Sequence, residues 1–327
     1  MNTLIRACAL LATVAAAALP ATASAQRSSS NVVRVVVPFA AGGSADMVAR
    51  LIGTKLAEGL GRSVIVDNKS GAGGQIGLQD VIRSAPDGNT LLVTPSGPIS
   101  ISPLLQQLPY DPPKDLVPIA MLAIVPTGVA VNAQSPIQNL QELISTAKSS
   151  KTGVLYSVPA IGTHMHLAGA LLESMTGAKL QAVPYRGTSP AVAAVASGEV
   201  TAGVSDLVTL LPMAAAGRLR ILAMTGVQRT SSAPTIATVA ELGVAGYSAD
   251  AWIGMFAPAG TPQAVVDQLN AEIGKILQQP DVRKTLTSSG LEPAPLTSAA
   301  GYAKSLADDR IKWAGVIQKA KIKLESN

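Results

Sequence analysis

The feature of this sequence that most constrains its fold is a pattern that occurs twice: an apolar strand, then a glycine-containing loop, then a helix. The first copy is VVRVVVPFAAGGSADMVARLIGTKL at 32–56, and the second is GVLYSVPAIGTHMHLAGALLESMTG at 153–177. In the first copy, apolar residues continue from Val32 to Val37 and then recur at helical spacing, with Ser44 at the expected cap position. Strand, loop and helix in this order are the unit from which sheets with covering helices are built.

Each copy places the N-terminus of a helix directly after a loop that carries little side-chain bulk. The first turn of a helix has unpaired backbone N–H groups and the positive end of the helix dipole, so such a loop is a ready site for an anion. Two such loops, far apart in the sequence, predict two halves of the protein that close on one anionic ligand.

The first 25 residues are predicted to be a secretory signal peptide. Arg6 gives a short positive region, residues 7–19 an apolar region, and Ala23-Ser24-Ala25 a cleavage site of small residues. The mature chain is therefore expected to begin near Gln26, and nothing after it offers the roughly 18 uninterrupted apolar residues of a membrane span. The one cysteine, Cys8, lies within the signal, so we expect no disulfide and no thiolate metal ligand in the mature protein.

The composition favours a well-packed globular protein over a disordered or nucleic-acid-binding one. Hydrophobic residues make up 48% of the chain and charged residues 14%, and the roughly 300 residues after the signal suffice for two domains of ordinary size. The formal net charge is +5, and the lysines and arginines are scattered. Their densest group, at 312–323, lies on a predicted helix whose other face carries Trp313 and Val316, which is typical of a solvated helix face.

After the signal, short apolar strands alternate with helical patterns, which predicts an α/β protein built on parallel sheets. One helix is expected to open at the Ser189-Pro190 pair and to close at Gly198, and another to open at the Thr261-Pro262 pair and to end before Pro280. Further strands are predicted at 64–66, 91–94, 128–131, 154–157, 180–184, 200–205, 219–224 and 252–257.

No repeat and no low-complexity linker divides the chain, so a second domain has to be inserted through short crossing segments. Two stretches fit such crossings: LVPIAMLAIVPTGVAVN, in which Pro126 interrupts consecutive strand-like runs, and GYSADAWIGMFAPAGTP. We therefore expect one lobe at 26–127 and 250–327, and the other at 128–249.

Motifs of catalysis and cofactor binding are missing or incomplete. The glycine block at 68–77 has the spacing GxGxxxG, and no acidic residue ends the strand at 91–94, so it departs from the dinucleotide-binding fingerprint. Neither GxxxxGK[ST] nor GxSxG occurs. His164 and His166 are the only histidines, and their i, i+2 spacing turns them in different directions. With dispersed carboxylates as well, the sequence predicts no metal site, no cofactor and no enzymatic activity.

Several side chains at strand ends are candidates for a ligand site, and each has a structural alternative. Phe39 and Tyr185 either line a cleft or fill the base of their loops, and cleft lining is the better fit for Phe39. Arg186 either grips a carboxylate in bidentate fashion or forms an ion pair elsewhere. Asp206 follows a strand at the edge where open sheets contact ligands, or it caps the next helix. One histidine either touches the ligand or stabilises a helix start, whereas Asp46 most simply supports the helix dipole.

Six motifs, in order, resemble a known family: VVVPFAAGGSADMVAR, VDNKSGAGGQIG, YSVPAIGTHMHLAG, VPYRGTSPAVAAVASGEV, GRLRILAMTG and WIGMFAPAGTP. Together with the preceding signal, they resemble the Bug (TctC-like) family of periplasmic solute-binding proteins associated with tripartite tricarboxylate transporters, over nearly all of the mature chain. The resemblance implies a two-lobed Venus-flytrap fold of type II. It also implies a cleft that holds small organic carboxylates through backbone N–H groups and ordered waters, without catalysis.

The resemblance assigns ligand-binding residues by position, and two departures affect them. Ser205 and Asp206 stand where family members commonly have Asp, often followed by Asn, so the carboxylate is displaced or its role is lost. Ala40 and Ala41 stand where prolines are frequent, which loosens the backbone of the first loop. The candidates, including those argued above, are Phe39, Ala40, Ala41, Gly42, Gly43, Thr94 and Ser96 on either side of Pro95, Ala160, Gly162, Thr163, His166, Tyr185, Ser205 and Asp206.

The sequence thus predicts a periplasmic, monomeric, non-enzymatic receptor that binds a small mono- or dicarboxylate, or an amino acid, between two α/β lobes. Closure would present a new surface to the membrane permease subunits of a tripartite tricarboxylate transporter. Two alternatives stay open: a ligand-binding sensor for a signalling partner, and a secreted α/β enzyme. The sequence does not name the carboxylate, because a site built from backbone donors leaves little trace in the side chains.

Overall fold

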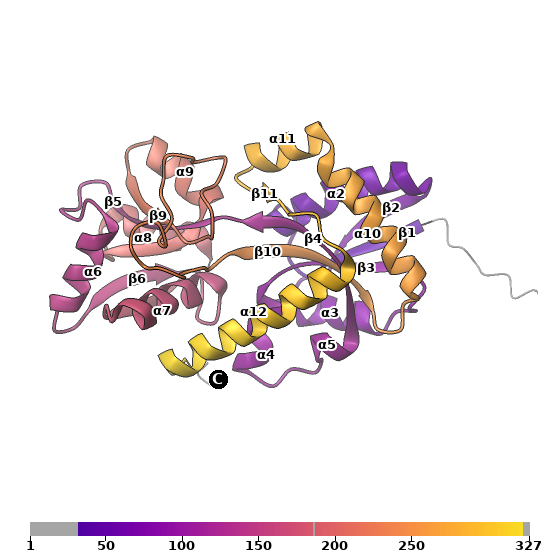
Figure 1. Cartoon of the computed structure of the whole chain (residues 1–327), viewed down its shortest axis with the longest axis horizontal. Helices are drawn as coiled ribbons and strands as arrows, with labels where there is room; N and C mark the ends of the chain where they lie inside the picture. The colour runs from indigo at the N-terminus through magenta and orange to yellow at the C-terminus, as the bar shows by residue number, and fades with distance from the viewer. Residues whose placement is uncertain (1–31, 186, 323–327) are drawn as a thin grey trace, which may run out of the picture. The chain divides into compact units, whose positions relative to one another are not determined.

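The computed structural model describes residues 32–185 and 187–322, which belong to one compact unit, Val32–Asn327. The predicted signal peptide at 1–25, with Cys8 and the cleavage site, lies outside the described residues, and so does Arg186. In the described part, the strands form two sheets, one of six strands and one of five (Figure 1).

The first sheet has the order β11-β4-β10-β3-β1-β2, and the second has the order β7-β6-β8-β5-β9. The strands of the first sheet are β1 (Val32–Val37), β2 (Ser63–Asn68), β3 (Thr90–Pro95), β4 (Leu116–Val125), β10 (Ala251–Pro258) and β11 (Glu292–Pro293). Those of the second sheet are β5 (Thr127–Asn132), β6 (Val154–Val158), β7 (Leu180–Pro184), β8 (Ala202–Asp206) and β9 (Leu219–Met224).

Helices follow most of the strands. They are α2 (Ser44–Leu60), α3 (Gln75–Ile82), α4 (Ser102–Leu105), α5 (Pro112–Asp115), α6 (Leu140–Ser149), α7 (His164–Thr176), α8 (Thr188–Ser197), α9 (Leu207–Ala215), α10 (Gln263–Gln278), α11 (Pro280–Ser288) and α12 (Ala299–Ala320), with short helical turns η2 (Ala72–Gly74) and η3 (Gly97–Ile101).

The strand directions are mixed, so the expectation of parallel sheets is only partly correct. β1 is parallel to β2 and β3, and β6 is parallel to β7 and β8. β10 is antiparallel to β3 and β4, whereas β5 is antiparallel to β8 and β9. β11 is antiparallel to β4. Among the antiparallel strands, β5 and β10 are those through which the chain enters the second sheet and returns to the first, and these passages have no crossover helix to reverse their direction.

Pro126 alone separates β4 of the first sheet from β5 of the second. Proline cannot donate to a strand ladder, so the first sheet's hydrogen bonding stops here. The register shows where the passages lie: Thr127 is opposite Asp206, Ala251 is opposite Val125, and Ile253 is opposite Pro95. The chain therefore leaves each sheet and enters the other at the edge where the parallel strands end.

β1 was predictable from its run of apolar residues. Four of its valines are fully buried, as expected for a strand covered on both faces: Val33, Val35, Val36 and Val37. Two predicted helix starts are wrong by one or two residues. The cap of α2 is Gly43 rather than Ser44, and the cap of α8 is Gly187 rather than Ser189. The Gly43 carbonyl oxygen accepts the first helical hydrogen bond from the Met47 N–H, and the Gly187 carbonyl oxygen accepts that from the Ala191 N–H. Each helix therefore starts before the serine that the sequence suggested as its cap.

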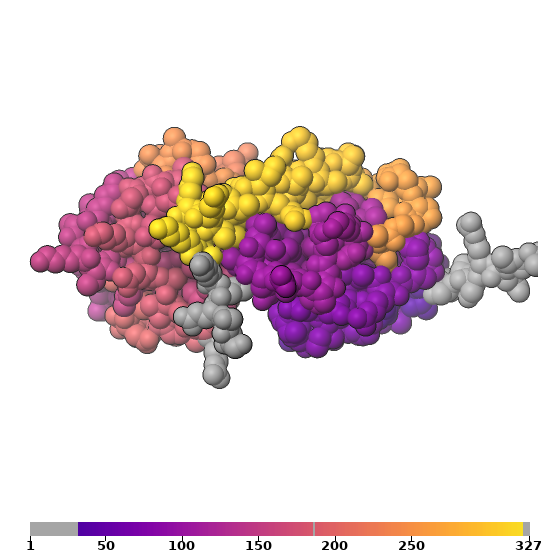
Figure 2. Space-filling model, turned by 90° about the horizontal axis from the view of Figure 1, so that it is seen from below, coloured from indigo at the N-terminus to yellow at the C-terminus, as the bar shows by residue number. Residues whose placement is uncertain are grey.

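α12 joins the cores of the two sheets. Near its start, the buried Tyr302 packs with Trp252 and Phe256 of β10 in the first sheet. Towards its end, Trp313 and Val316 belong to the core cluster of the second sheet, against α7. Figure 2 shows α12, in yellow, lying along the surface.

Candidate functional site

The first loop, residues 38–43, follows β1 and leads into α2. Ala40, Ala41, Gly42 and Gly43 are exposed, so the backbone of this loop is open to solvent. Gly42 has a φ of +88°, a left-handed conformation that favours glycine. No side chain caps the N-terminus of α2. The first turn of α2 therefore keeps its N–H groups available for an anion.

Asp46 of α2 holds this loop in place. It is buried, and its carboxylate accepts hydrogen bonds from the Gly42 N–H (2.9 Å), Arg50 Nε (3.1 Å) and Asn68 Nδ2 (3.0 Å). Asn68 Nδ2 also donates to the carbonyl oxygen of Phe39 (3.2 Å). Hydrogen bonding to Arg50 is the main cause that lowers the pKa of Asp46, so the carboxylate is ionised and its charge is compensated by the guanidinium.

The second loop, residues 159–163, follows β6 and leads into α7. Gly162 has a φ of +80°, and its N–H donates to Nδ1 of His166 at 3.0 Å. Thr163 caps α7, because its hydroxyl oxygen accepts the N–H of His166 and donates to the carbonyl oxygen of Ala160. Burial lowers the pKa of His166, which keeps the ring neutral, with Nδ1 as the acceptor.

The two loops thus share one local design. In each, a glycine with positive φ donates its N–H to a side chain four residues later, in the first turn of the following helix: Gly42 to Asp46, and Gly162 to His166. Sequence reasoning placed Asp46 and one histidine at helix starts but did not predict their bonds to Gly42 and Gly162. The signal available was a polar side chain three residues into the helix, directly after a glycine loop.

The other candidates of the first sheet lie beside the first loop. Since β1 and β3 are parallel neighbours, Pro95 and the residues around it are at the same edge as the end of β1. Thr94 and Ser96 are 0% and 2% exposed. The Thr94 hydroxyl donates to the carbonyl oxygen of Pro95 (3.3 Å), and the Ser96 N–H donates to that of Trp252 (2.9 Å). Phe39 is half-buried and packs on the core of the first sheet.

The remaining candidates of the second sheet lie beside the second loop. Asp206 caps α9: its Oδ1 accepts from the Thr209 N–H (3.0 Å) and hydroxyl (2.7 Å). Ser205 is buried, 3.4 Å from the same hydroxyl. The side chain of Tyr185 is half-buried, and its hydroxyl donates a hydrogen bond to Oε1 of Glu199 (2.6 Å). Asp206 therefore forms the helix cap that was expected as one alternative, and the Tyr185 hydroxyl is held by Glu199.

The structure brings the candidates together as two groups, one at the end of β1 and β3 and one at the end of β6, β7 and β8. Both groups lie at the sheet edges through which the chain passes between the sheets, as the register at Thr127 and Ala251 shows. Edges where parallel strands end are where open α/β sheets bind ligands.

Four cavities of about 360 to 620 Å³ are lined by other residues. One, of about 490 Å³, lies beside the passages between the sheets and is lined by Pro126, Asp250 and Glu292 among others. Another, of about 410 Å³, is apolar and lies between α5 and α12. The candidate residues of the two loops are not among those that line these four cavities.

In residues 32–185 and 187–322, no group of three or more histidine, cysteine or acidic side chains is arranged to hold a metal ion. Among the same residues, no helix is long and apolar enough to cross a membrane.

Solved structures identify the class of fold. An R. palustris protein whose structure contains adipate matches with a TM-score of 0.77 at 33% identity, covering 89% of this chain and 97% of that one. MatC from Rhodopseudomonas palustris, with bound malate, matches with a TM-score of 0.74 at 32% identity over 88% and 98% of the two chains. The periplasmic binding protein BugD gives a TM-score of 0.74 at 31% identity over 89% and 98%. The protein has the two-lobed α/β fold of periplasmic binding proteins, as predicted.

The family is equally clear. The model of the tripartite tricarboxylate transporter family receptor matches residues 48–322. Protein BugT of Bordetella pertussis is 33% identical over 316 residues, which are 95% of this chain and 96% of that protein. This chain belongs to the tripartite tricarboxylate transporter receptor family, which is a family of solute-binding receptors and not of enzymes.

Proposed function

We propose that this protein is a periplasmic receptor that captures a small organic carboxylate between its two lobes and delivers it to the membrane subunits of a tripartite tricarboxylate transporter. The observation that carries the proposal is the pair of glycine loops, each braced by a side chain of the following helix. Both lie at sheet edges that adjoin the passage at Pro126.

In this proposal, residues 26–127 and 250–327 form one lobe, and residues 128–249 form the other. The proposed ligand contacts come from both. They are Phe39, Ala40, Ala41, Gly42, Gly43, Thr94 and Ser96 from the first lobe, and Ala160, Gly162, Thr163, His166, Tyr185, Ser205 and Asp206 from the second. At the buried Thr94 and Ser96, the contribution is the shape of the loop more than a hydroxyl contact.

A carboxylate suits the first loop for an electrostatic reason. The uncapped start of α2 offers N–H donors and the positive end of the helix dipole. The negative charge of Asp46 does not oppose this, because Arg50 pairs with it at 2.9 Å. Hydrogen bonds to a charged group contribute about 1.5 to 3 kcal/mol each, so two or three of them supply most of a micromolar affinity of about 8 kcal/mol.

The relatives support this ligand class. Two proteins at 32–33% identity were solved with adipate and with malate, which are both dicarboxylates. A dicarboxylate has one anionic group for each loop, so it would bridge the two lobes.

Calorimetry on the exported protein tests the proposal with adipate and malate as probes and with adipamide as the matched control. Adipamide keeps the length of adipate and one carbonyl oxygen at each end, but an NH2 group replaces the other oxygen and the molecule has no charge. We expect micromolar binding of at least one dicarboxylate and none of adipamide. Equal binding of adipate and adipamide, or no binding in a wider screen of mono- and dicarboxylates and amino acids, would contradict it. Mass spectrometry of the same sample checks that the mature chain starts near Gln26.

A further inference from the structure

His164 is the first residue of α7, directly after the second loop, yet it is only 5% exposed. Its Nε2 lies 2.9 Å from the carbonyl oxygen of Ala249. Its ring stands edge-on to Trp313 of α12, with 5.1 Å between the ring centroids and 81° between the planes. The side chain therefore contacts the protein interior and leaves the ligand contacts of α7 to other groups.

The acceptor of this hydrogen bond belongs to the passages between the sheets. The Ala249 carbonyl oxygen also accepts the hydroxyl of Thr225 (3.1 Å), and the Thr225 N–H donates to the carbonyl oxygen of Thr127 (2.9 Å). Thr127 opens β5, and Ala249 lies two residues before β10. His164 thus connects the start of α7 to both strands through which the chain changes sheets.

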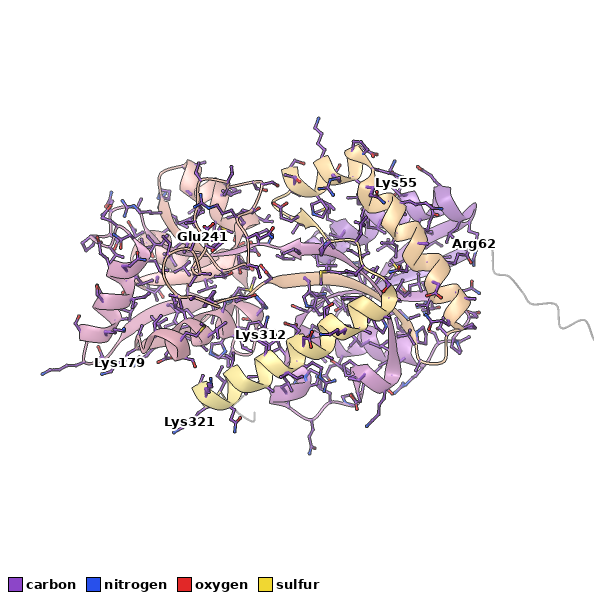
Figure 3. The ribbon with its side chains drawn as sticks, in the orientation of Figure 1. Lys55, Arg62, Lys179, Glu241, Lys312 and Lys321 are labelled. Carbon is purple, nitrogen blue, oxygen red and sulfur yellow. The ribbon has the colours of Figure 1, made fainter. Side chains whose placement is uncertain are left out.

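On its other side, His164 meets α12. Lys312 Nζ lies 4.5 Å from the centre of the Trp313 ring and 3.0 Å from Asp309, which in turn accepts the indole N–H of Trp252 in β10 (3.2 Å). Figure 3 shows Lys312 on α12, whose end packs against α7. The contacts of His164 therefore reach the first sheet by two routes, through Ala249 and through α12.

The proton of His164 is at a defined place. A carbonyl oxygen only accepts, so Nε2 carries the hydrogen and Nδ1 is bare. Among the described residues, this Nδ1 and the Trp313 Nε1 are buried without a hydrogen-bond partner. Burial lowers the pKa of His164 to about 4, so the ring is neutral near pH 7 and supplies one donor.

We propose that His164 is a positioning residue: through its Ala249 bond and its packing on Trp313, it fixes the second loop relative to the passages between the lobes before ligand binds. This rests on the proposed function, which makes that loop a ligand site. A loop that is already ordered loses less conformational freedom on binding, so the ligand binds more tightly. The two histidines then have separate roles, since His166 shapes the loop internally through Gly162 and His164 fixes it from outside.

Three variants separate the donor from the ring. His164→Phe keeps an aromatic ring against Trp313 and removes the N–H, whereas His164→Gln restores a donor at similar reach. Tyr247→Phe is the matched control, because it deletes another buried bond to α7, from the Tyr247 hydroxyl to the carbonyl oxygen of Ala168 (2.9 Å), one turn beyond the loop. Melting curves confirm that each variant is folded.

Two measurements are made on the full mature chain: hydrogen exchange of residues 159–166 without ligand, and calorimetric Kd for adipate and malate. In His164→Phe we expect exchange to accelerate and Kd to rise, each roughly five- to tenfold, the size of one lost hydrogen bond. We expect His164→Gln to recover most of both effects and Tyr247→Phe to show neither.

Unchanged exchange in His164→Phe, or equal effects in Tyr247→Phe, overturns the positioning role. Failure of the wild-type protein to bind any carboxylate overturns the proposed function instead, and the ligand-free exchange then decides whether His164 positions the loop.

Discussion

Gly42 and Gly43 are adjacent in the first loop but differ in what they require of the backbone. Gly42 has a φ of +88°, and its N–H is taken by Asp46. Gly43 has a φ of −81° and a ψ of 170°, a conformation open to any residue. An added Cβ at Gly43 would have only the carbonyl oxygen of Ala40 within 4 Å, at 3.9 Å. The two positions therefore differ in their need for glycine, although they are adjacent in the sequence.

We predict that Gly42→Ala weakens binding of adipate or malate and that Gly43→Ala leaves it nearly unchanged. An alanine at positive φ costs about 1 to 2 kcal/mol, and the loop relieves this strain by abandoning the Asp46 bond. We expect an increase in Kd of about tenfold for Gly42→Ala, which corresponds to roughly 1.4 kcal/mol. Calorimetry on both variants, with melting temperatures as the folding control, checks this; an equal effect at the two positions would count against it.

The buried histidine His164 makes stability depend on pH. Burial, the main cause, lowers its pKa from 6.5 to about 4, with Lys312 adding to the shift while the Ala249 hydrogen bond and Asp309 oppose it. The pKa of His164 is lower in the folded protein than in the unfolded chain, so the contribution of His164 to the unfolding free energy is fully present above pH 6.5. It is lost as the pH falls to about 4, because over this range the unfolded chain takes up a proton and the folded protein does not.

We therefore predict that, between pH 7 and pH 4, the wild-type protein loses about 3 kcal/mol more unfolding free energy than His164→Gln, from a shift of about 2.5 units at 1.36 kcal/mol each. Urea unfolding curves at half-unit pH steps measure the difference. Comparing the two proteins cancels the carboxylates and His166, which titrate in both. Parallel pH curves for the two proteins would refute the prediction.

At the scale of single elements, α7 depends on a glycine in its interior. The hydroxyl of the buried Tyr156 in β6 donates to the carbonyl oxygen of His166 (3.0 Å), and its ring lies against the helix at Gly169. A Cβ on Gly169 would overlap that ring. By contrast, a Cβ on Gly315, in the interior of α12, would have no atom within 4 Å.

We predict opposite effects of the same substitution at these two glycines. Gly315→Ala raises the unfolding free energy by up to about 1 kcal/mol, through helix propensity alone. Gly169→Ala lowers it by about 1 to 2 kcal/mol, because overpacking outweighs the same propensity gain. Chemical denaturation of the two variants tests the pair. Stabilisation by Gly169→Ala would show that Tyr156 moves away at little cost.

Elements were predictable where local pattern determines them. The buried valines of β1 and the left-handed Gly198 that ends α8 are examples. β11, with only Glu292 and Pro293, was not predictable, because two residues pair with β4 only when tertiary packing brings them there. At the site, loop positions followed from glycine spacing, but the roles of Asp46 and His164 did not. Their partners Asn68 and Ala249 are 22 and 85 residues away, and no local pattern records such contacts.

At the scale of the whole molecule, the passages between the sheets are short, and α12 packs into both cores. A hinge at Pro126 and near Asp250 would allow the lobes to close on a ligand.

We predict that the radius of gyration from small-angle scattering decreases when adipate or malate saturates the protein. Adipamide at the same concentration is the control. An unchanged radius at saturation, with binding shown by calorimetry, would argue against closure.

The sequence contains two tryptophans, one that contacts α12 and one that belongs to it: Trp252 donates to Asp309, and Trp313 makes a T-shaped contact with His164. Indole emission responds to the groups around it, so all of the protein's tryptophan fluorescence originates at the junction that would move on closure. The receptor therefore carries an intrinsic optical reporter of its own state. Trp252→Phe would isolate the signal of Trp313, which allows ligands to be screened without attaching a dye.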